Sequence, residues 1–438
     1  MRKFLALFPV VLLCACVGKP DINRDGGIHL VMEVSVPDFL RENIYPNDSL
    51  ALETISEALE SSDKRGMAIL DSYFDKLEKK STVVLSLHFT DRNLPPRASA
   101  KEVRDFFKNK FERNCARVKV VLAERLDKYG TYVNIQSGGD LARFTIDIPG
   151  QPNMERIRTL IQSNAHLEFW ETIDNSETYE AFTNLNDDLG KDYRKAVLSE
   201  SAVTDATEEK VEVASKSLND QLAEVDKTVE EEQRVSQLAI DSMKNANPVF
   251  GLLSPSYQFD GSGRPTSLLP GPVVGYSKAR DTAKVNEIIR QGFEKHYFKK
   301  YSKFLWCAKP RRNMNEEYYE LVAVMGDRYG AKLSGDIIVD ASVKDGGGSF
   351  QVSITMNRQA AEDWKSMTRD NVGKAVAMVL DGRVLSYPNV VEEISGGVSS
   401  ITGAFTENEA SDLAAILKAG SLPVSVKIVG ENVVAPAK

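Results

Sequence analysis

The sequence predicts an α+β protein, and three kinds of pattern carry that prediction. Short runs of apolar residues alternate or cluster as strands do, for example at 28–36 and 143–148. Other stretches place apolar residues three or four positions apart, which is the period of an amphipathic helix. Two-residue turns such as Asp381-Gly382 favour hairpins, and hairpins join antiparallel strands.

The first part of the chain has the element order of a ferredoxin-like fold. Ser99 is placed to cap a helix that starts at Ala100 and stops at Gly130. A broken helical stripe covers 50–79, and 83–89 reads as a strand. The remaining elements are strands at 28–36, 132–136, 143–148 and 165–172, and a helix at 154–161. Without the 50–89 stretch the order is β-α-β-β-α-β.

Residues 176–250 are polar, but they keep a helical period. Apolar residues recur three or four positions apart between Val211 and Val229, which predicts a solvent-exposed helical arm rather than disorder. A loop rich in proline, glycine and serine is expected at 247–275.

The last third predicts a second α+β subdomain. Strands are expected at 336–343 and 350–356, followed by a helix that Asn357 caps. The turn Asp381-Gly382 and the pair Gly396-Gly397 predict two hairpins, the second between 390–394 and 400–405. The run 406–409 is a capping box that opens a helix ending at Gly420, and 424–429 is a final strand.

Composition narrows the functional classes. The 438 residues carry a formal charge of −8 and no dense basic run, so nucleic acid is not an expected partner. After residue 20 no apolar run approaches the ~20 residues that a membrane-spanning helix needs.

The N-terminus has the layout of a secretory signal. Arg2 and Lys3 precede a short apolar stretch, and Leu13-Cys14-Ala15-Cys16 follows it. This tetrapeptide looks like a bacterial lipobox. We therefore predict a signal peptide at 1–15, acylation of Cys16 and a tether at 16–24. The alternative is a plain cleaved signal in which Cys16 is incidental.

No residue pattern points to catalysis or to a cofactor. The four histidines, His29, His88, His166 and His296, form no metal-binding spacing, and no G-x-S-x-G motif surrounds Ser395. Cys115 and Cys307 are interpreted as buried free thiols, although export permits a disulfide. We expect no enzyme activity, no metal and no cofactor, with an envelope hydrolase as a weaker alternative.

Three segments in order resemble the SecD family of protein-export subunits, and in particular the fused SecD–SecF proteins of Bacteroidetes-type bacteria. The most specific runs from Met356 to Val429 and includes VLDGRVLSYPN, ISGGVSSITGAFT and ILKAGSLP. The others are IDIPG with HLEFWET, between 146 and 172, and GGIHLVMEVSVPD, from Gly26 to Asp38. The resemblance covers nearly all of 25–434.

The resemblance implies the first large periplasmic domain of SecD, here on a lipid anchor and without the family's membrane helices. The family's proton coupling uses ionisable residues inside the membrane, so this chain is not expected to supply it. The implied parts are a ferredoxin-like base at 25–175 with the final strand at 422–434, a helical arm and loop at 176–330, and a head at 331–421.

The implied role is assistance to Sec-dependent protein export by a lipoprotein of the bacterial envelope that faces the periplasm. Its expected partners are components of the Sec translocon and unfolded secretory proteins, with the membrane reached through the lipid. The alternative is a structural envelope lipoprotein that uses the same fold to bind an unrelated partner. The sequence names no substrate-binding residue and does not distinguish the inner from the outer membrane.

Overall fold

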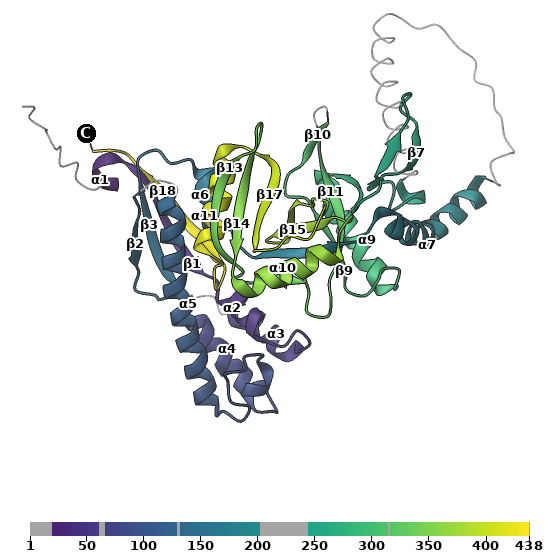
Figure 1. Cartoon of the computed structure of the whole chain (residues 1–438). Helices are drawn as coiled ribbons and strands as arrows, with labels where there is room; N and C mark the ends of the chain where they lie inside the picture. The colour runs from purple at the N-terminus through teal and green to yellow at the C-terminus, as the bar shows by residue number, and fades with distance from the viewer. Residues whose placement is uncertain (1–19, 61–65, 129–131, 202–243, 314–315, 438) are drawn as a thin grey trace, which may run out of the picture. The chain divides into compact units, whose positions relative to one another are not determined.

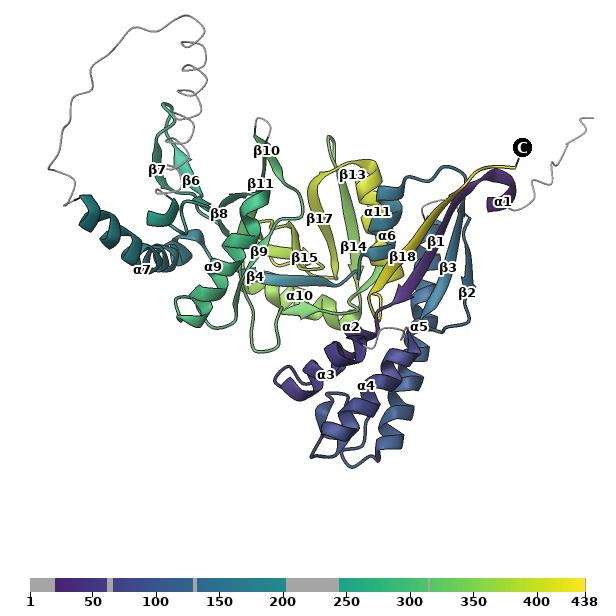
Figure 2. The same cartoon turned by 180° about the vertical axis from the view of Figure 1, so that it is seen from behind.

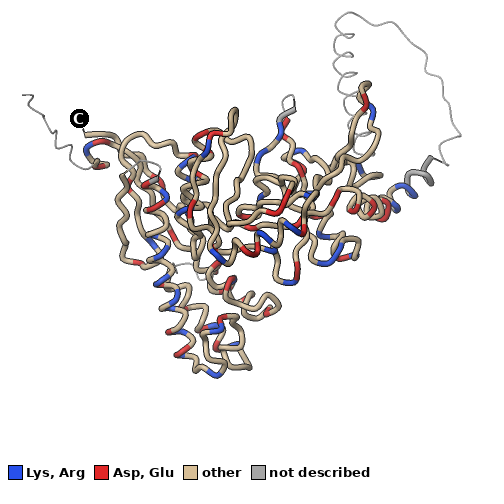
Figure 3. Tube along the Cα trace, in the orientation of Figure 1, with Lys and Arg blue, Asp and Glu red and all other residues tan. Residues whose placement is uncertain are grey.

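The computed structural model describes residues 20–60, 66–128, 132–201, 244–313 and 316–437. Helices and several sheets coexist, so the predicted α+β class is confirmed. Contacts divide the chain into two compact units, residues 1–165 with 408–438 and residues 166–407. No helix in the described part of the chain is both long and apolar enough to cross a membrane. Basic and acidic residues are interspersed along the described trace (Figure 3).

The first unit combines one sheet with seven α-helices among its described residues (Figure 1). The helices are α1 (Ile22–Asp25), α2 (Val36–Asn43), α3 (Ser49–Glu60), α4 (Met67–Lys80), α5 (Ala100–Lys128), α6 (Met154–Gln162) and α11 (Glu407–Ala419), with a 3-10 turn η1 (Leu85–His88). The strands are β1 (Gly27–Val34), β2 (Asn134–Ser137), β3 (Arg143–Pro149) and β18 (Val426–Val434).

The sheet of the first unit has the order β18-β1-β3-β2, and every neighbouring pair is antiparallel. Leu30 lies opposite Ile146 in its centre, and both side chains are fully buried. Strand alternation in β1 and β3 therefore sends one face into the core, which α5 covers (Figure 2).

The strand predicted at 165–172 to complete this sheet lies elsewhere, which corrects the assignment of a ferredoxin-like base to 25–175. It forms β4 (Leu167–Thr172), which pairs within the second unit. The reason is burial. Leu167, Phe169 and Trp170 are all buried, so this strand needs cover on both faces, which a central position in a larger sheet provides. The final strand expected in the base, at 422–434, does join this sheet as β18 beside β1.

The core of the first unit is rich in aromatic rings. Phe107 and Phe111 on α5 pack edge-to-face against Phe39 of α2, with ring centroids 6.2 and 5.0 Å apart. Ser99 and Glu102 bond to each other across the start of α5, as the predicted cap requires.

The second unit holds a nine-stranded sheet, a three-stranded sheet and a hairpin (Figure 1). Its helices are α7 (Asn175–Ser201), α9 (Thr282–Glu294) and α10 (Arg358–Asp370), with the 3-10 turn η2 (Ala279–Asp281). The remaining strands of the nine-stranded sheet are β5 (Ser254–Pro255), β8 (Val273–Lys278), β9 (Ser302–Trp306), β10 (Arg311–Asn313), β11 (Glu316–Met325), β12 (Leu333–Ser334), β15 (Val376–Leu380) and β16 (Arg383–Ser386). The other strands are β6 (Tyr257–Phe259) with β7 (Pro265–Leu268), and β13 (Ile338–Asp345), β14 (Phe350–Met356) and β17 (Val398–Phe405).

Three predicted elements are wrong. The expected strand at 83–89 is mostly η1. The Ser86 hydroxyl donates to the Pro96 carbonyl and the His88 ring pairs with the Asp48 carboxylate, which holds the segment in this turn. The expected loop at 247–275 contains β5, the β6–β7 hairpin and the start of β8. Residues 390–394 form no strand, and β17 pairs with β14 instead.

Helix α11, which lies within the expected head at 331–421, packs mostly in the first unit. There Arg156 of α6 donates two hydrogen bonds of 2.8 and 2.6 Å to the carboxylate of Asp412. The carboxylate is largely buried, so the pair joins two helices far apart in sequence.

The helical arm is described only in its first part. Helix α7 confirms helical structure over 175–201, whereas the stripe from Val211 to Val229 lies outside the described residues. Residues 1–19, which contain the signal peptide and Cys16, lie outside them as well. Cys115 and Cys307 are free and buried, as interpreted from the sequence. Burial raises the pKa of the Cys115 thiol to about 12, which keeps it protonated at neutral pH.

Candidate functional site

The candidate site is a groove in the second unit, formed by α10, the segment 388–394, β15 and β17. We call it the α10 groove; its volume is ≈ 410 Å³. Its lining residues are Trp364, Val376, Met378, Pro388, Asn389, Val390, Val391, Glu392, Ile394, Val398, Ser399 and Ser400.

Helix α10 is fixed in place by its cap and its buried face. The Asn357 side chain accepts a hydrogen bond from the Ala360 amide at 2.9 Å and donates one to the Asp336 carbonyl at 3.1 Å. The Trp364 ring is 1% exposed and lies 4.8 Å from the Phe169 ring of β4. The helix is therefore held on the sheet by an aromatic contact as well as by its cap.

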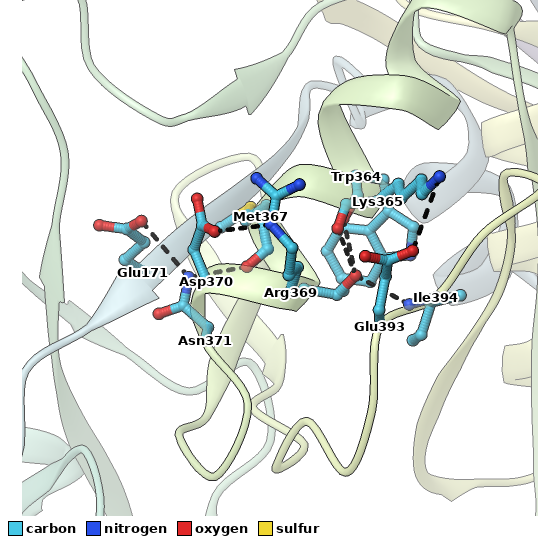
Figure 4. A network of polar contacts seen from close by, with 10 residues as sticks. Glu171, Trp364, Lys365, Met367, Arg369, Asp370, Asn371, Glu393 and Ile394 are labelled. Atoms are coloured by element: carbon cyan, nitrogen blue, oxygen red, sulfur yellow. Dashed lines mark hydrogen bonds and ion pairs between the residues drawn. The ribbon is translucent and has the colours of Figure 1, made fainter.

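Polar contacts hold the C-terminal end of α10 and the segment beside it (Figure 4). The Asn371 amide donates to the Met367 carbonyl at 2.8 Å and to the Glu171 carboxylate at 3.3 Å. The Thr368 hydroxyl accepts from the Ile394 amide at 2.9 Å. The helix end is thereby tied both to β4 and to the 388–394 segment.

The 388–394 segment is an ordered wall without regular secondary structure. The Val390 amide donates to the Lys374 carbonyl at 2.8 Å, and the Val390 carbonyl accepts from the Gly373 amide at the same distance. Lys365 and Glu393 form an ion pair of 3.6 Å over the segment (Figure 4). Val391 in this segment is 86% exposed, so an apolar side chain of the wall is accessible to solvent.

Trp364 lines the groove, but its indole N–H is not accessible from it. The nitrogen is buried and has no hydrogen-bond partner among the described residues. A buried N–H without an acceptor costs on the order of 1–3 kcal/mol.

A second polar cluster in this unit is not a nucleophilic site. Glu320 is 5% exposed and accepts a hydrogen bond from the Tyr387 hydroxyl at 2.8 Å and one from the Cys307 thiol at 3.5 Å. Arg311 completes the cluster as an ion pair of 2.5 Å with Glu320. Burial and the carboxylate raise the pKa of Cys307, so its thiol is not activated.

The residues singled out by sequence are not gathered into one site. The His166 side chain is half exposed, and its Nε2 lies 3.4 Å from the Glu168 carboxylate. The His88 side chain is buried and pairs with the Asp48 carboxylate. In the described ranges no three potential metal ligands cluster. Sequence reasoning missed Trp364 as a site residue and read the 390–394 wall as a strand. The adjacent acids Glu392 and Glu393 interrupt the apolar alternation there and were the available signal.

Comparison with known proteins first identifies the kind of subdomain that contains the groove. Residues 320–424, which contain the whole α10 groove, match the SecDF P1 head subdomain. The groove therefore belongs to a head subdomain of the kind found in SecD and SecDF.

The similarity extends over nearly the whole chain. Protein translocase subunit SecD of Rhodothermus marinus is 30% identical over 423 residues, which cover 96% of this chain and 63% of that protein. SecD of Leptotrichia buccalis is 42% identical over 103 residues, covering 23% of this chain and 26% of that protein. SecDF of Thermus thermophilus is 40% identical over 105 residues, covering 24% and 14%. The chain is thus similar to SecD over nearly its whole length, and it spans less than two thirds of the length of these relatives.

Solved structures of SecDF also match, with low TM-scores. A crystal structure of SecDF in its super-membrane-facing form aligns with 95% of this chain and 31% of its own, at 17% identity and a TM-score of 0.39. A structure of SecDF described as a membrane component that enhances protein export aligns with 73% of this chain and 92% of its own, at 20% identity and a TM-score of 0.34. The similarity to SecD is therefore stated from the sequence relatives and from the head match alone.

Proposed function

We propose that the chain is a SecD-like lipoprotein of the bacterial envelope that assists Sec-dependent export by holding translocating chains in the α10 groove. The observation that carries the proposal is the exposed Val391 on the α10 groove, in a region that matches the SecDF P1 head subdomain. An unfolded chain carries apolar side chains that can pack against Val391.

The same proposal includes the anchor and the partners. Acylated Cys16 would hold the chain at the envelope membrane, with the folded units in the periplasm and the Sec translocon nearby. A second candidate is a structural envelope lipoprotein whose head binds one folded partner. The exposed Val391 is compatible with both candidates, so the nature of the captured protein distinguishes them.

The test is site-specific crosslinking in cells that accumulate a stalled secretory precursor. A photoreactive residue at Val391, in the groove, is expected to capture the precursor. The same residue at Val339, which is 58% exposed on β13 and does not line the groove, is the matched control. Equal capture at both positions, or no capture at Val391, would contradict the proposal, and capture of one folded partner would favour the structural candidate.

A further inference from the structure

An exposed apolar patch in the first unit lies on the connection between α4 and α5. Its members are Val83, Val84 and Leu87, which are 51%, 46% and 54% exposed around η1. We call these three side chains the η1 patch. The connection lies at the lower end of the unit in Figure 1, where α4 ends and α5 begins. The η1 patch is therefore carried by a projecting turn.

Buried neighbours keep the η1 patch on the outside of the turn. Leu85 and Phe89 are buried, and the Phe89 ring centroid lies 4.3 Å from that of Phe107 on α5. The Ser86 hydroxyl donates to the Pro96 carbonyl at 2.6 Å, which joins the two halves of the connection. Because these neighbours are fixed in the fold, the patch cannot turn inward to bury its own side chains.

The chain around the η1 patch is rich in positive charge. Between 79 and 101 it has a single acidic residue, Asp91, which Lys110 neutralises at 2.5 Å. The cationic residues of the same stretch are Lys79, Lys80, Arg92, Arg97 and Lys101. The patch is therefore accompanied by an excess of cations.

Three of these cations are not compensated within the fold. Lys80 is paired with Glu57. Lys79, Arg92 and Arg97 are exposed and form no ion pair in the part of the chain that the structure describes.

The acids that flank the stretch do not supply the missing partners. Glu78 is bound by Arg104 at 2.6 Å, and Glu102 accepts from the Ser99 amide and hydroxyl at 2.7 Å. The charge that these three cations lack must come from outside the described fold.

Exposed apolar side chains beside uncompensated cations match the surface of an anionic bilayer. The apolar groups enter the interface, while lysine and arginine lay their stems along it and direct their charges to lipid phosphates. A site for a peptide or a small molecule would be concave instead. We propose that the η1 patch inserts into the interface of an anionic phospholipid bilayer, with Lys79, Arg92 and Arg97 on the phosphates. This contact requires neither acylation of Cys16 nor the α10 groove.

The test places a polarity-sensitive fluorescent amino acid at Thr82, an exposed position beside the patch, in the full chain. Vesicles of phosphatidylglycerol and phosphatidylcholine in equal parts should shift its emission to the blue, and brominated lipid should quench it. Vesicles of phosphatidylcholine alone should bind about tenfold more weakly, as should the double variant Arg92→Gln, Arg97→Gln with the anionic vesicles. The signal is local to residue 82, so attachment through the N-terminus alone does not produce it.

A matched pair of leucines makes the result specific. Leu87→Glu should weaken the shift about tenfold, because it removes an apolar group and adds a charge that the bilayer repels. Leu141→Glu, at a leucine that is 48% exposed between β2 and β3 of the same unit, should leave it unchanged. The fluorophore placed at Leu141 should show no shift.

Three results would overturn the proposal. The first is no shift at Thr82 with anionic vesicles, and the second is an equal shift at Leu141. The third is a shift that appears only with envelope membranes that retain their proteins, which would assign the η1 patch to a protein partner.

Discussion

At the scale of single residues, the first unit depends on polar side chains that link segments far apart in sequence. Arg125 of α5 is fully buried and donates hydrogen bonds to the carbonyls of Leu160 at 3.0 Å, Ser163 at 2.5 Å and Gly420 at 2.9 Å. These carbonyls lie at the C-terminal ends of α6 and α11, where a cation is favourable. One side chain thus supplies hydrogen-bond donors to the carbonyls at the C-terminal ends of two helices.

Replacing Arg125 by Met should be strongly destabilising. The three carbonyls lose their donor and remain buried, so the free energy of unfolding should fall by about 3 kcal/mol. Urea denaturation followed by circular dichroism measures the change. Arg113→Met, at an exposed position of the same helix, should stay within about 0.5 kcal/mol of the native chain. Equal effects of the two changes would refute the linking role of Arg125.

The Asp48–His88 pair makes stability depend on pH. Burial disfavours the charge of Asp48, but the Ala51 amide and the His88 ring, 2.5 Å away, lower the pKa of its carboxyl below the ordinary value. A lowered carboxyl pKa stabilises the folded state above the unfolded pKa, near 4, and this contribution disappears as pH falls through the folded pKa.

Asp48→Asn should therefore be less stable than the native chain at pH 6, by an amount that narrows as pH falls below about 4. Asparagine still accepts from the Ala51 amide, so the change isolates the charge. Thermal melts of both chains between pH 3 and pH 7 measure the difference. A difference that is constant over this range would contradict the assignment.

At the scale of elements, turns decide how the strands of the second unit pair. Asp381 and Gly382 join β15 to β16 with φ of 49° and 78°, which is the left-handed region that the sequence prediction of this hairpin requires. The Asp381 carboxylate also accepts a hydrogen bond from the His166 amide at 3.0 Å, next to β4. The turn therefore fixes the edge of the sheet as well as the hairpin.

Gly382→Val should destabilise the hairpin by about 1–2 kcal/mol, the cost of a left-handed conformation for a residue with a side chain. A Cβ at this position has open space around it, so the effect comes from the backbone alone. Gly261→Val is the matched control, because that glycine also has open space but no positive φ. Thermal unfolding that shows equal losses for both variants would disprove the turn argument.

At the scale of the whole molecule, the second unit is inserted into the first. The chain leaves the first unit at Ala165 and returns to it at Asn408, so β18 and α11 complete a unit that begins with β1. Residues 20–24 lead directly into β1.

Lipid attachment is the prediction that belongs to this scale. Acylation uses the Cys16 thiol, so Cys16→Ser should abolish incorporation of a clickable palmitate analogue and leave the precursor uncleaved. Mobility on gels and label in the protein band measure both effects. Cys14→Ser, two residues earlier, should retain the label. Label at native level in Cys16→Ser would exclude the lipoprotein interpretation.

The sequence by itself determined the class of fold and most local elements, because their causes lie within a few residues. The cap at Asn357, the turn at Asp381-Gly382 and the periodicity of α5 each depend on side chains within one or two turns of chain. The resemblance to the SecD family was likewise carried by local motifs, and the relatives confirmed it.

Only the tertiary structure decided which partners these elements take. Local alternation identifies Leu167–Thr172 as a strand but says nothing of its neighbours, and β4 pairs with β15 rather than β1 because it is buried on both faces. The α10 groove could not be predicted for the same reason. Trp364 reads as an ordinary core residue, and only the packing of α10 beside 388–394, β15 and β17 makes it part of a groove lining.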